Sequence, residues 1–267
     1  MDNKYRPIGV FDSGIGGLTV LKEIIKEMPN ESTIYLGDTA RVPYGIRSPE
    51  TVIRYSLENT HFLYSKDIKL LVVACNTASS ISLDSIRRTV SIPVVGVIEP
   101  GAKAAVRTTR NKRVGVIGTE ATIRSSSYEK SIKSVDRDIE VYQLPCPLFV
   151  PLVEEGWVEG EIATMVAEKY LLDMKDIGID TLVLGCTHYP LLKGVISKVM
   201  DKEVTLIDSA VEVAKEIKEI LETSDLKKGY QGGALREFYV TDLPERFVIV
   251  GERFLGSSIE HIEMIKL

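Results

Sequence analysis

Short apolar runs recur along most of the chain, and most are followed by a segment of helix length. The runs lie at residues 8–11, 33–36, 69–74, 93–97, 113–117, 139–142, 181–184 and 204–207. Helical patterns lie at residues 17–28, 50–65, 77–90 and 158–174, and two more run as far as residues 133 and 200. Strands that are apolar along their whole length are typical of βαβ units, whose sheets are covered on both faces. The sequence therefore predicts an α/β fold with mainly parallel sheets.

A weak internal repeat divides the pattern into two halves. The segment GVFDSG at residues 9–14 parallels GVIGTE at 115–120, and LVVACNT at 71–77 parallels LVLGCTH at 182–188. The repeats predict two similar α/β domains, residues 1–98 plus 209–267 and residues 99–208, with the active site in the cleft between them. Residues 209–267 are too few to bury an α/β core alone, so they are expected to pack on the first half. Within them, residues 244–255 fit either a strand or a helix, and the pattern favours a helix with Asp242 as its N-cap.

Composition excludes several classes of function. A net charge of −5 without a basic patch argues against nucleic acid as a partner. The sequence has no apolar run of membrane-spanning length and no apolar leader at its N-terminus, so no membrane partner is expected. Three cysteines do not form a disulfide framework, and the cysteines and histidines lack metal-ligand spacing. We expect a cytoplasmic protein without a metal site.

Cys75 and Cys186 carry the strongest chemical signal, because each follows a predicted buried strand at equivalent places in the two halves. Ligands of open α/β sheets bind beyond the carboxyl ends of the strands. Each thiol is also expected to precede a helix, whose N-terminus lowers a thiol pKa. Cys146, between two prolines, is expected to be a buried and inert thiol.

Two thiols across a cleft suit the inversion of a stereocentre, in which one removes a proton and the other supplies one. Asp12 is expected to orient or deprotonate Cys75, and His188 to do the same for Cys186. Two other classes stay open: a cysteine hydrolase with His188 as base, and an amino-acid-binding module without activity. The glycine segment at residues 14–17 lacks the spacing of a dinucleotide fingerprint, so no nucleotide is expected.

Six segments together resemble glutamate racemase, within the aspartate/glutamate racemase superfamily. They are DSGIGGL (12–18), DTARVPYG (38–45), ACNTA (74–78), GTEAT (118–122), CPLFVPLVE (146–154) and GCTHYP (185–190). The resemblance covers essentially the whole chain. It implies cofactor-independent interconversion of L- and D-glutamate, which supplies D-glutamate for peptidoglycan, and a homodimer. A racemase of the same superfamily that acts on aspartate is the nearest alternative.

The resemblance also implies roles for individual residues. Cys75 would deprotonate D-glutamate and Cys186 would deprotonate L-glutamate. Substrate contacts would come from Asp12, Ser13, Pro43, Tyr44, Gly45, Asn76, Thr77, Thr119, Thr122, Glu154, Thr187 and His188. Glu155 stands beside Glu154, and the sequence leaves open which of the two faces the site.

Overall fold

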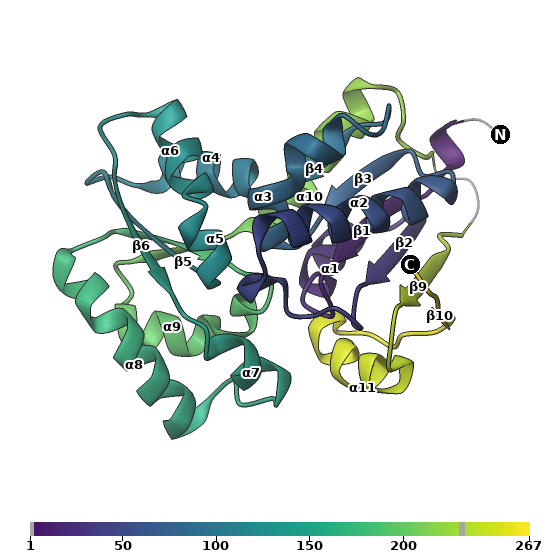
Figure 1. Ribbon diagram of the computed structural model, residues 1–267. Coiled ribbons are helices and arrows are strands. Elements are labelled where there is room, and N and C mark those ends of the chain that lie inside the picture. Colours follow the sequence, from purple (N-terminus) through teal and green to yellow (C-terminus); the bar gives the residue numbers. More distant parts are fainter. Residues whose placement is uncertain (1–2, 230–232) are drawn as a thin grey trace.

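The computed structural model describes residues 3–229 and 233–267. Residues 1–2 and 230–232, which fall in the predicted first domain, lie outside the described residues. Figure 1 shows two lobes, each built around its own sheet, with the yellow C-terminal segment beside the purple N-terminal strands. Within the described ranges, no helix is both long and apolar enough to cross a membrane.

The first sheet has, in the part of the chain that is described, six parallel strands in the order β10-β9-β2-β1-β3-β4. They are β1 (Ile8–Asp12), β2 (Thr33–Gly37), β3 (Leu70–Val73), β4 (Val94–Gly96), β9 (Arg236–Val240) and β10 (Ile262–Met264). The apolar pattern did not predict β9 and β10. Both come from the C-terminal segment and extend the sheet beyond β2, so this segment does pack on the first half.

The second sheet has the order β6-β5-β7-β8, again with parallel pairing. Its described strands are β5 (Arg113–Gly118), β6 (Glu140–Pro145), β7 (Thr181–Gly185) and β8 (Thr205–Asp208). This order matches β2-β1-β3-β4, so the repeated segments occupy equivalent strands: β1 corresponds to β5 and β3 to β7. The prediction of two similar α/β domains with parallel sheets is confirmed.

Among the described residues, at least one α-helix lies between every two successive strands. The α-helices are α1 (Leu18–Glu27), α2 (Pro49–Ser65), α3 (Asn76–Arg87), α4 (Ile98–Thr108), α5 (Glu120–Arg124), α6 (Ser127–Val135), α7 (Phe149–Glu154), α8 (Gly160–Ile177), α9 (Lys193–Met200), α10 (Ser209–Thr223) and α11 (Pro244–Leu255). Short 3₁₀ turns are η1 (Asn3–Tyr5), η2 (Tyr44–Ile46) and η3 (Tyr189–Leu192). The chain passes between the sheets twice, through α4 and through α10.

Both faces of the first sheet are covered, because successive strand residues point to opposite sides. Val10 and Val72 belong to the core that includes residues of α1 and α10. Phe11 and Val73 belong to a separate core with residues of α2 and α3. The apolar strands predicted from the sequence are therefore explained by burial on two sides.

Three local expectations were wrong. The helix predicted to run to residue 133 breaks after α5, because Ser126 adopts a left-handed φ of 54° before α6 begins. The helix predicted to follow Cys186 begins only at α9, after the η3 turn that contains Pro190. The N-cap of α11 is Leu243 rather than Asp242, whose carboxylate accepts a hydrogen bond from the Leu243 amide at 2.9 Å.

Candidate active site

A cavity of about 170 Å³ lies where the carboxyl ends of the two sheets meet, and both Cys75 and Cys186 line it. Cys75 follows β3 and Cys186 follows β7, which are equivalent strands of the two lobes. Each of the two residues is only 6% exposed. The two thiols that the sequence singled out therefore share one cavity, with one thiol contributed by each lobe.

Eleven of the predicted site residues line this cavity. They are Ser13, Pro43, Tyr44, Gly45, Cys75, Asn76, Thr77, Thr119, Cys186, Thr187 and His188. The prediction missed six further lining residues: Val42, Ile46, Glu120, Pro147, Val150 and Pro151. Five of these six lie inside the segments that carry the resemblance, and Ile46 lies directly beside one of them. Position in those segments was therefore a usable signal for the wall of the cavity.

Cys75 is the N-cap of α3. Its sulfur accepts a hydrogen bond from the Ala78 amide at 3.5 Å and lies 3.6 Å from the Ser13 hydroxyl. Burial nevertheless raises the pKa of Cys75 to about 12, and the nearby charge of Asp12 adds to the rise. The expectation that the helix N-terminus lowers the pKa of this thiol was wrong, because loss of solvation outweighs the amide.

Asp12 lies behind Cys75 rather than in the wall of the cavity. Its Oδ2 accepts a hydrogen bond from the Gly14 amide at 2.8 Å, and Oδ1 is buried without a partner among the described residues. Burial raises the pKa of this carboxyl above its ordinary value, against the opposing charge of His188. Asp12 therefore influences the site through its charge, which raises the pKa of Cys75.

Cys186 faces a different environment. Its sulfur lies 3.9 Å from Nδ1 of His188, whose Nε2 lies 3.2 Å from a carboxylate oxygen of Glu154. Burial lowers the pKa of His188, but the contacts to Cys186 and Glu154 outweigh it and raise that pKa to about 10. The hydrogen bond from His188 in turn lowers the pKa of Glu154. One half-site therefore holds a neutral thiol, whereas in the other the thiol lies beside the charged pair of His188 and Glu154.

Glu154 does not line the cavity, although it contacts the imidazole that does. It ends α7, and its carboxylate also lies 3.9 Å from Arg246. Glu155 is mostly exposed and pairs only loosely with Arg246. Of the two neighbouring glutamates, Glu154 is thus the one that reaches the site.

A loop between β2 and α2 forms another wall. The Tyr44 hydroxyl donates a hydrogen bond to Asp38 and accepts one from the Asn59 amide at 3.0 Å. A Cβ at Gly45 would lie 2.8 Å from Cβ of Thr119, so only glycine lets this loop approach the second lobe so closely. The loop residues are therefore held in place from both lobes.

Three threonines join the lobes beside Cys75. The hydroxyl of Thr77 lies 2.9 Å from that of Thr119 and 3.3 Å from that of Thr122, and Thr119 and Thr122 are 3.0 Å apart. Thr122 is buried outside the cavity wall and supports the other two. This layer of hydroxyls is a polar contact between the lobes.

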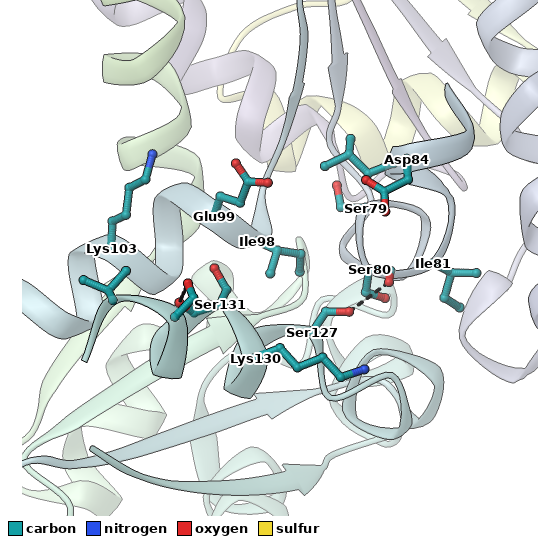
Figure 2. Close-up of a pocket in the computed structure, with 13 residues that line it drawn as sticks. Ser79, Ser80, Ile81, Asp84, Ile98, Glu99, Lys103, Ser127, Lys130 and Ser131 are labelled. Carbon is teal, nitrogen blue, oxygen red and sulfur yellow. Dashed lines mark hydrogen bonds between the residues drawn. The ribbon is translucent and has the colours of Figure 1, made fainter. Parts of the chain in front are cut away.

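A more open groove of about 480 Å³ runs between α3, α4 and α6 (Figure 2). Serines of α3 and α6 and the lysines Lys103 and Lys130 line it, and neither thiol of interest does. Among the described residues, no group of three or more His, Cys, Asp or Glu side chains is arranged to hold a metal ion. The thiol cavity is therefore the candidate active site.

Comparisons with known proteins agree with this geometry. Residues 8–217 match the family described as Asp/Glu/Hydantoin racemase. A glutamate racemase of Geobacter metallireducens is 56% identical over 263 residues, which cover 98% of this chain and 97% of that protein. The crystal structure of glutamate racemase RacE1 from Bacillus anthracis is similar, with a TM-score of 0.95, 41% identity and coverage of 99% and 98%.

The crystal structure of a Francisella tularensis glutamate racemase in complex with D-glutamate is similar as well. Its TM-score is 0.93 and its identity 41%, and the match covers 98% of both chains. These likenesses extend over both lobes and include the segments that form the thiol cavity. They favour the predicted racemase over the hydrolase and the binding module. The chain belongs to the Asp/Glu/Hydantoin racemase family and, within it, to the glutamate racemases.

Proposed function

We propose that this protein interconverts L- and D-glutamate without a cofactor, with Cys75 and Cys186 as the acid and the base. The observation that carries the proposal is that one cavity is lined by both thiols, one from each lobe. The D-glutamate bound to the Francisella relative supports glutamate as the substrate. Inversion requires a base on one face of the α-carbon and an acid on the other, and two thiols in one cavity can fill both roles.

In the direction from L- to D-glutamate, Cys186 removes the α-proton. The electron pair of the broken C–H bond stays on the α-carbon. Cys75, which burial holds as the neutral thiol with a pKa of about 12, then donates its proton to the opposite face. The reaction leaves Cys186 protonated and Cys75 ionised, and the two thiols exchange roles when D-glutamate is the substrate.

The neighbours of each thiol act as its partners. His188 beside Cys186 supplies a positive charge, because its contacts raise its pKa to about 10 despite burial. Asp12 lies behind Cys75 and takes or returns its proton when that thiol must ionise. Proton transfer by Cys186 is therefore assisted by His188, and proton transfer by Cys75 by Asp12.

The polar wall suits a substrate with two carboxylates and one ammonium group. Hydroxyls of Ser13, Thr77 and Thr187 and the amide of Asn76 line the cavity. Buried carboxylates need such donors, because an unsatisfied charge in a closed site is costly. The apolar side chains of Val42, Pro147 and Val150 exclude water, which strengthens those contacts.

We further infer the cellular setting and the assembly. The family resemblance supports a cytoplasmic enzyme that supplies D-glutamate for peptidoglycan. It also supports a homodimer, and exposed apolar side chains of α8, among them Ile162 and Met165, offer surface for one. Sedimentation equilibrium tests the assembly directly, and a monomer at micromolar concentration would contradict it.

The two crossings of the chain support the division into domains. Residues 1–98 plus 209–267 then form the first domain and residues 99–208 the second. The proposed boundaries fall at the start of α4 and at the junction of β8 with α10. Limited proteolysis tests them, and early cleavage inside a sheet rather than near the crossings would argue against this division.

The decisive variants are Cys75→Ala and Cys186→Ala. Each removes the acid or base from one face, so each is expected to lower racemisation by about 10²–10⁴-fold while the fold is kept. Circular dichroism follows inversion of L-glutamate without added cofactor, and proton NMR in D₂O follows loss of the α-proton. L-Aspartate is offered in parallel to test the nearest alternative substrate.

Cys146→Ala is the matched control. Cys146 is also a fully buried thiol, but it does not line the cavity, so turnover should be unchanged. Near-wild-type turnover by either Cys75→Ala or Cys186→Ala would sink the two-thiol mechanism. Faster turnover of aspartate than of glutamate would reassign the substrate.

A further inference from the structure

Tyr128 of α6 reaches across the seam between the lobes. The residue is 1% exposed, and its hydroxyl donates a hydrogen bond to Oδ1 of Asn76 at 2.7 Å. The same hydroxyl lies 3.0 Å from that of Ser209. Asn76 directly follows Cys75, and Ser209 begins α10, where the chain returns to the first lobe. The hydroxyl therefore connects the second lobe to the residue beside one thiol.

The ring of Tyr128 packs beside the other thiol. A Cβ at Gly185, the residue directly before Cys186, would lie 3.0 Å from Cε2 of this ring. A Cβ at Gly101 in α4 would lie 3.3 Å from Cε1 and 2.7 Å from the Ser209 hydroxyl. Gly185 and Gly101 thus allow the Tyr128 ring to pack closely on two sides, beside Cys186 and beside α4, where the chain first crosses between the lobes.

Other side chains of α6 line an open groove, whereas Tyr128 does not. Ser127, Lys130 and Ser131 line the groove against α3, where the Ser127 hydroxyl donates to the backbone oxygen of Ser80 at 2.9 Å (Figure 2). Tyr128 lies in the core instead. This one side chain touches the neighbours of both thiols and both crossings of the chain.

We propose that Tyr128 is a positioning residue that sets the separation of Cys75 and Cys186. The proposal rests on the proposed two-thiol racemisation. Inversion needs both sulfurs at the same carbon at once, whereas removal and return of a proton on one face needs only one. A small displacement of one lobe against the other therefore slows inversion more than it slows exchange on one face.

The test uses Tyr128→Phe, which keeps the ring and removes the hydroxyl. L-Glutamate is incubated with the full-length protein in D₂O and sampled at low conversion. Chiral separation and mass spectrometry then give two rates: formation of D-glutamate, and deuterium uptake into recovered L-glutamate. We expect kcat for inversion to fall about tenfold with a smaller change in KM, and the ratio of exchange to inversion to rise.

Two further variants make the result specific. Tyr170→Phe removes a hydroxyl that accepts a hydrogen bond from the Leu148 amide at 3.3 Å within the second lobe, and it should leave the ratio unchanged. Ser209→Ala removes only the second partner of Tyr128 and should raise the ratio by less than Tyr128→Phe. If Tyr128→Phe fails to fold, the ratio of exchange to inversion in Ser209→Ala tests the positioning role instead.

A merely structural loss lowers the amount of active protein and leaves the ratio of exchange to inversion constant. A wild-type ratio in folded Tyr128→Phe, or in Ser209→Ala when the first variant does not fold, overturns the proposal. An equal rise in Tyr170→Phe overturns it as well. A wild-type protein that neither inverts nor exchanges glutamate overturns the proposed function instead, and the positioning role with it.

Discussion

At the scale of residues, the positions of Cys75 and Cys186 at strand ends were enough to predict that the two thiols would meet. Cys75 and Cys186 follow equivalent parallel strands, whose carboxyl ends form the ligand-binding edge of such sheets. The electrostatics of the thiols could not be predicted in the same way. The pKa of Cys75 depends on burial and on Asp12, which lies 63 positions earlier in the chain, and both effects exist only after folding.

The choice between Glu154 and Glu155 also needed the structure. Both follow the same apolar segment, and the sequence contains no feature that distinguishes them. In the fold, Glu154 ends α7 and contacts His188, whereas Glu155 is exposed beyond that end. A shift of one residue along a helix turns a side chain by about 100°, which decides which one reaches the site.

Glu154→Gln is expected to change the pH dependence of racemisation. Burial lowers the pKa of His188, but Cys186 and Glu154 raise it to about 10, so the imidazolium is lost only as the pH rises through about 10. Removal of one anionic partner brings that pKa down toward its ordinary value. The high-pH limb of kcat/KM for L-glutamate should move to lower pH by about one unit.

Circular dichroism across a pH series measures this limb. Glu155→Gln is the matched control, because its carboxylate is mostly exposed and the substitution changes the same charge. Its limb should stay at the wild-type position. Coincident limbs in the two variants would show that Glu154 does not govern the ionisation of His188.

At the scale of elements, the internal repeat predicted two similar halves, and the structure shows that these halves share glycine packing as well as strand order. Gly9 of β1 lies against Ile68, and Gly115 of β5 lies against Ile179. The two isoleucines are 111 residues apart, as are Cys75 and Cys186. The elements that the sequence analysis missed have neither a repeated counterpart nor a clear apolar pattern. The strand β9 begins with Arg236 and Glu237, and α7 is a short helix that contains a proline.

Gly9→Ala and Gly115→Ala are expected to destabilise the protein to a similar degree. An added Cβ would lie 2.6 Å from Cδ1 of Ile68 in one case and 2.5 Å from Cδ1 of Ile179 in the other. Overpacking of this kind costs about 1–3 kcal/mol in the free energy of unfolding. Urea denaturation measures the loss for each variant.

Gly194→Ala supplies the contrasting case. A Cβ at this position of α9 meets nothing within 4 Å, so the helix should gain about 0.5–1 kcal/mol. A large loss at Gly9 with none at Gly115 would show that the two sheets are not packed equivalently, despite their matching strand order.

At the scale of the whole molecule, the site and the buried ion pair of Lys69 and Glu31 lie at opposite ends of the first sheet. Lys69 precedes β3, whereas Cys75 follows it. The Lys69 ammonium lies 2.5 Å from the Glu31 carboxylate, with side chains 1% and 2% exposed. It also donates to the backbone oxygens of Lys4 and Leu226, both at 2.8 Å. The Lys69 ammonium thus joins three segments that lie far apart in the chain, at the end of the sheet away from the cavity. No local sequence pattern could predict that these segments would come together.

Lys69→Met is therefore expected to weaken the fold without changing the chemistry. The substitution leaves the Glu31 carboxylate buried without its cation, which costs about 3–5 kcal/mol in the free energy of unfolding. The double variant Glu31→Gln/Lys69→Met removes both charges and should lose less. Urea denaturation measures both, and kcat/KM of the folded fraction should match the wild-type value because the cavity lies at the far end of the sheet. If the double variant were less stable than Lys69→Met, the cost of Lys69→Met would not come from leaving the Glu31 carboxylate buried without its cation. A changed kcat/KM would mean that strain at one end of the sheet reaches the thiols at the other.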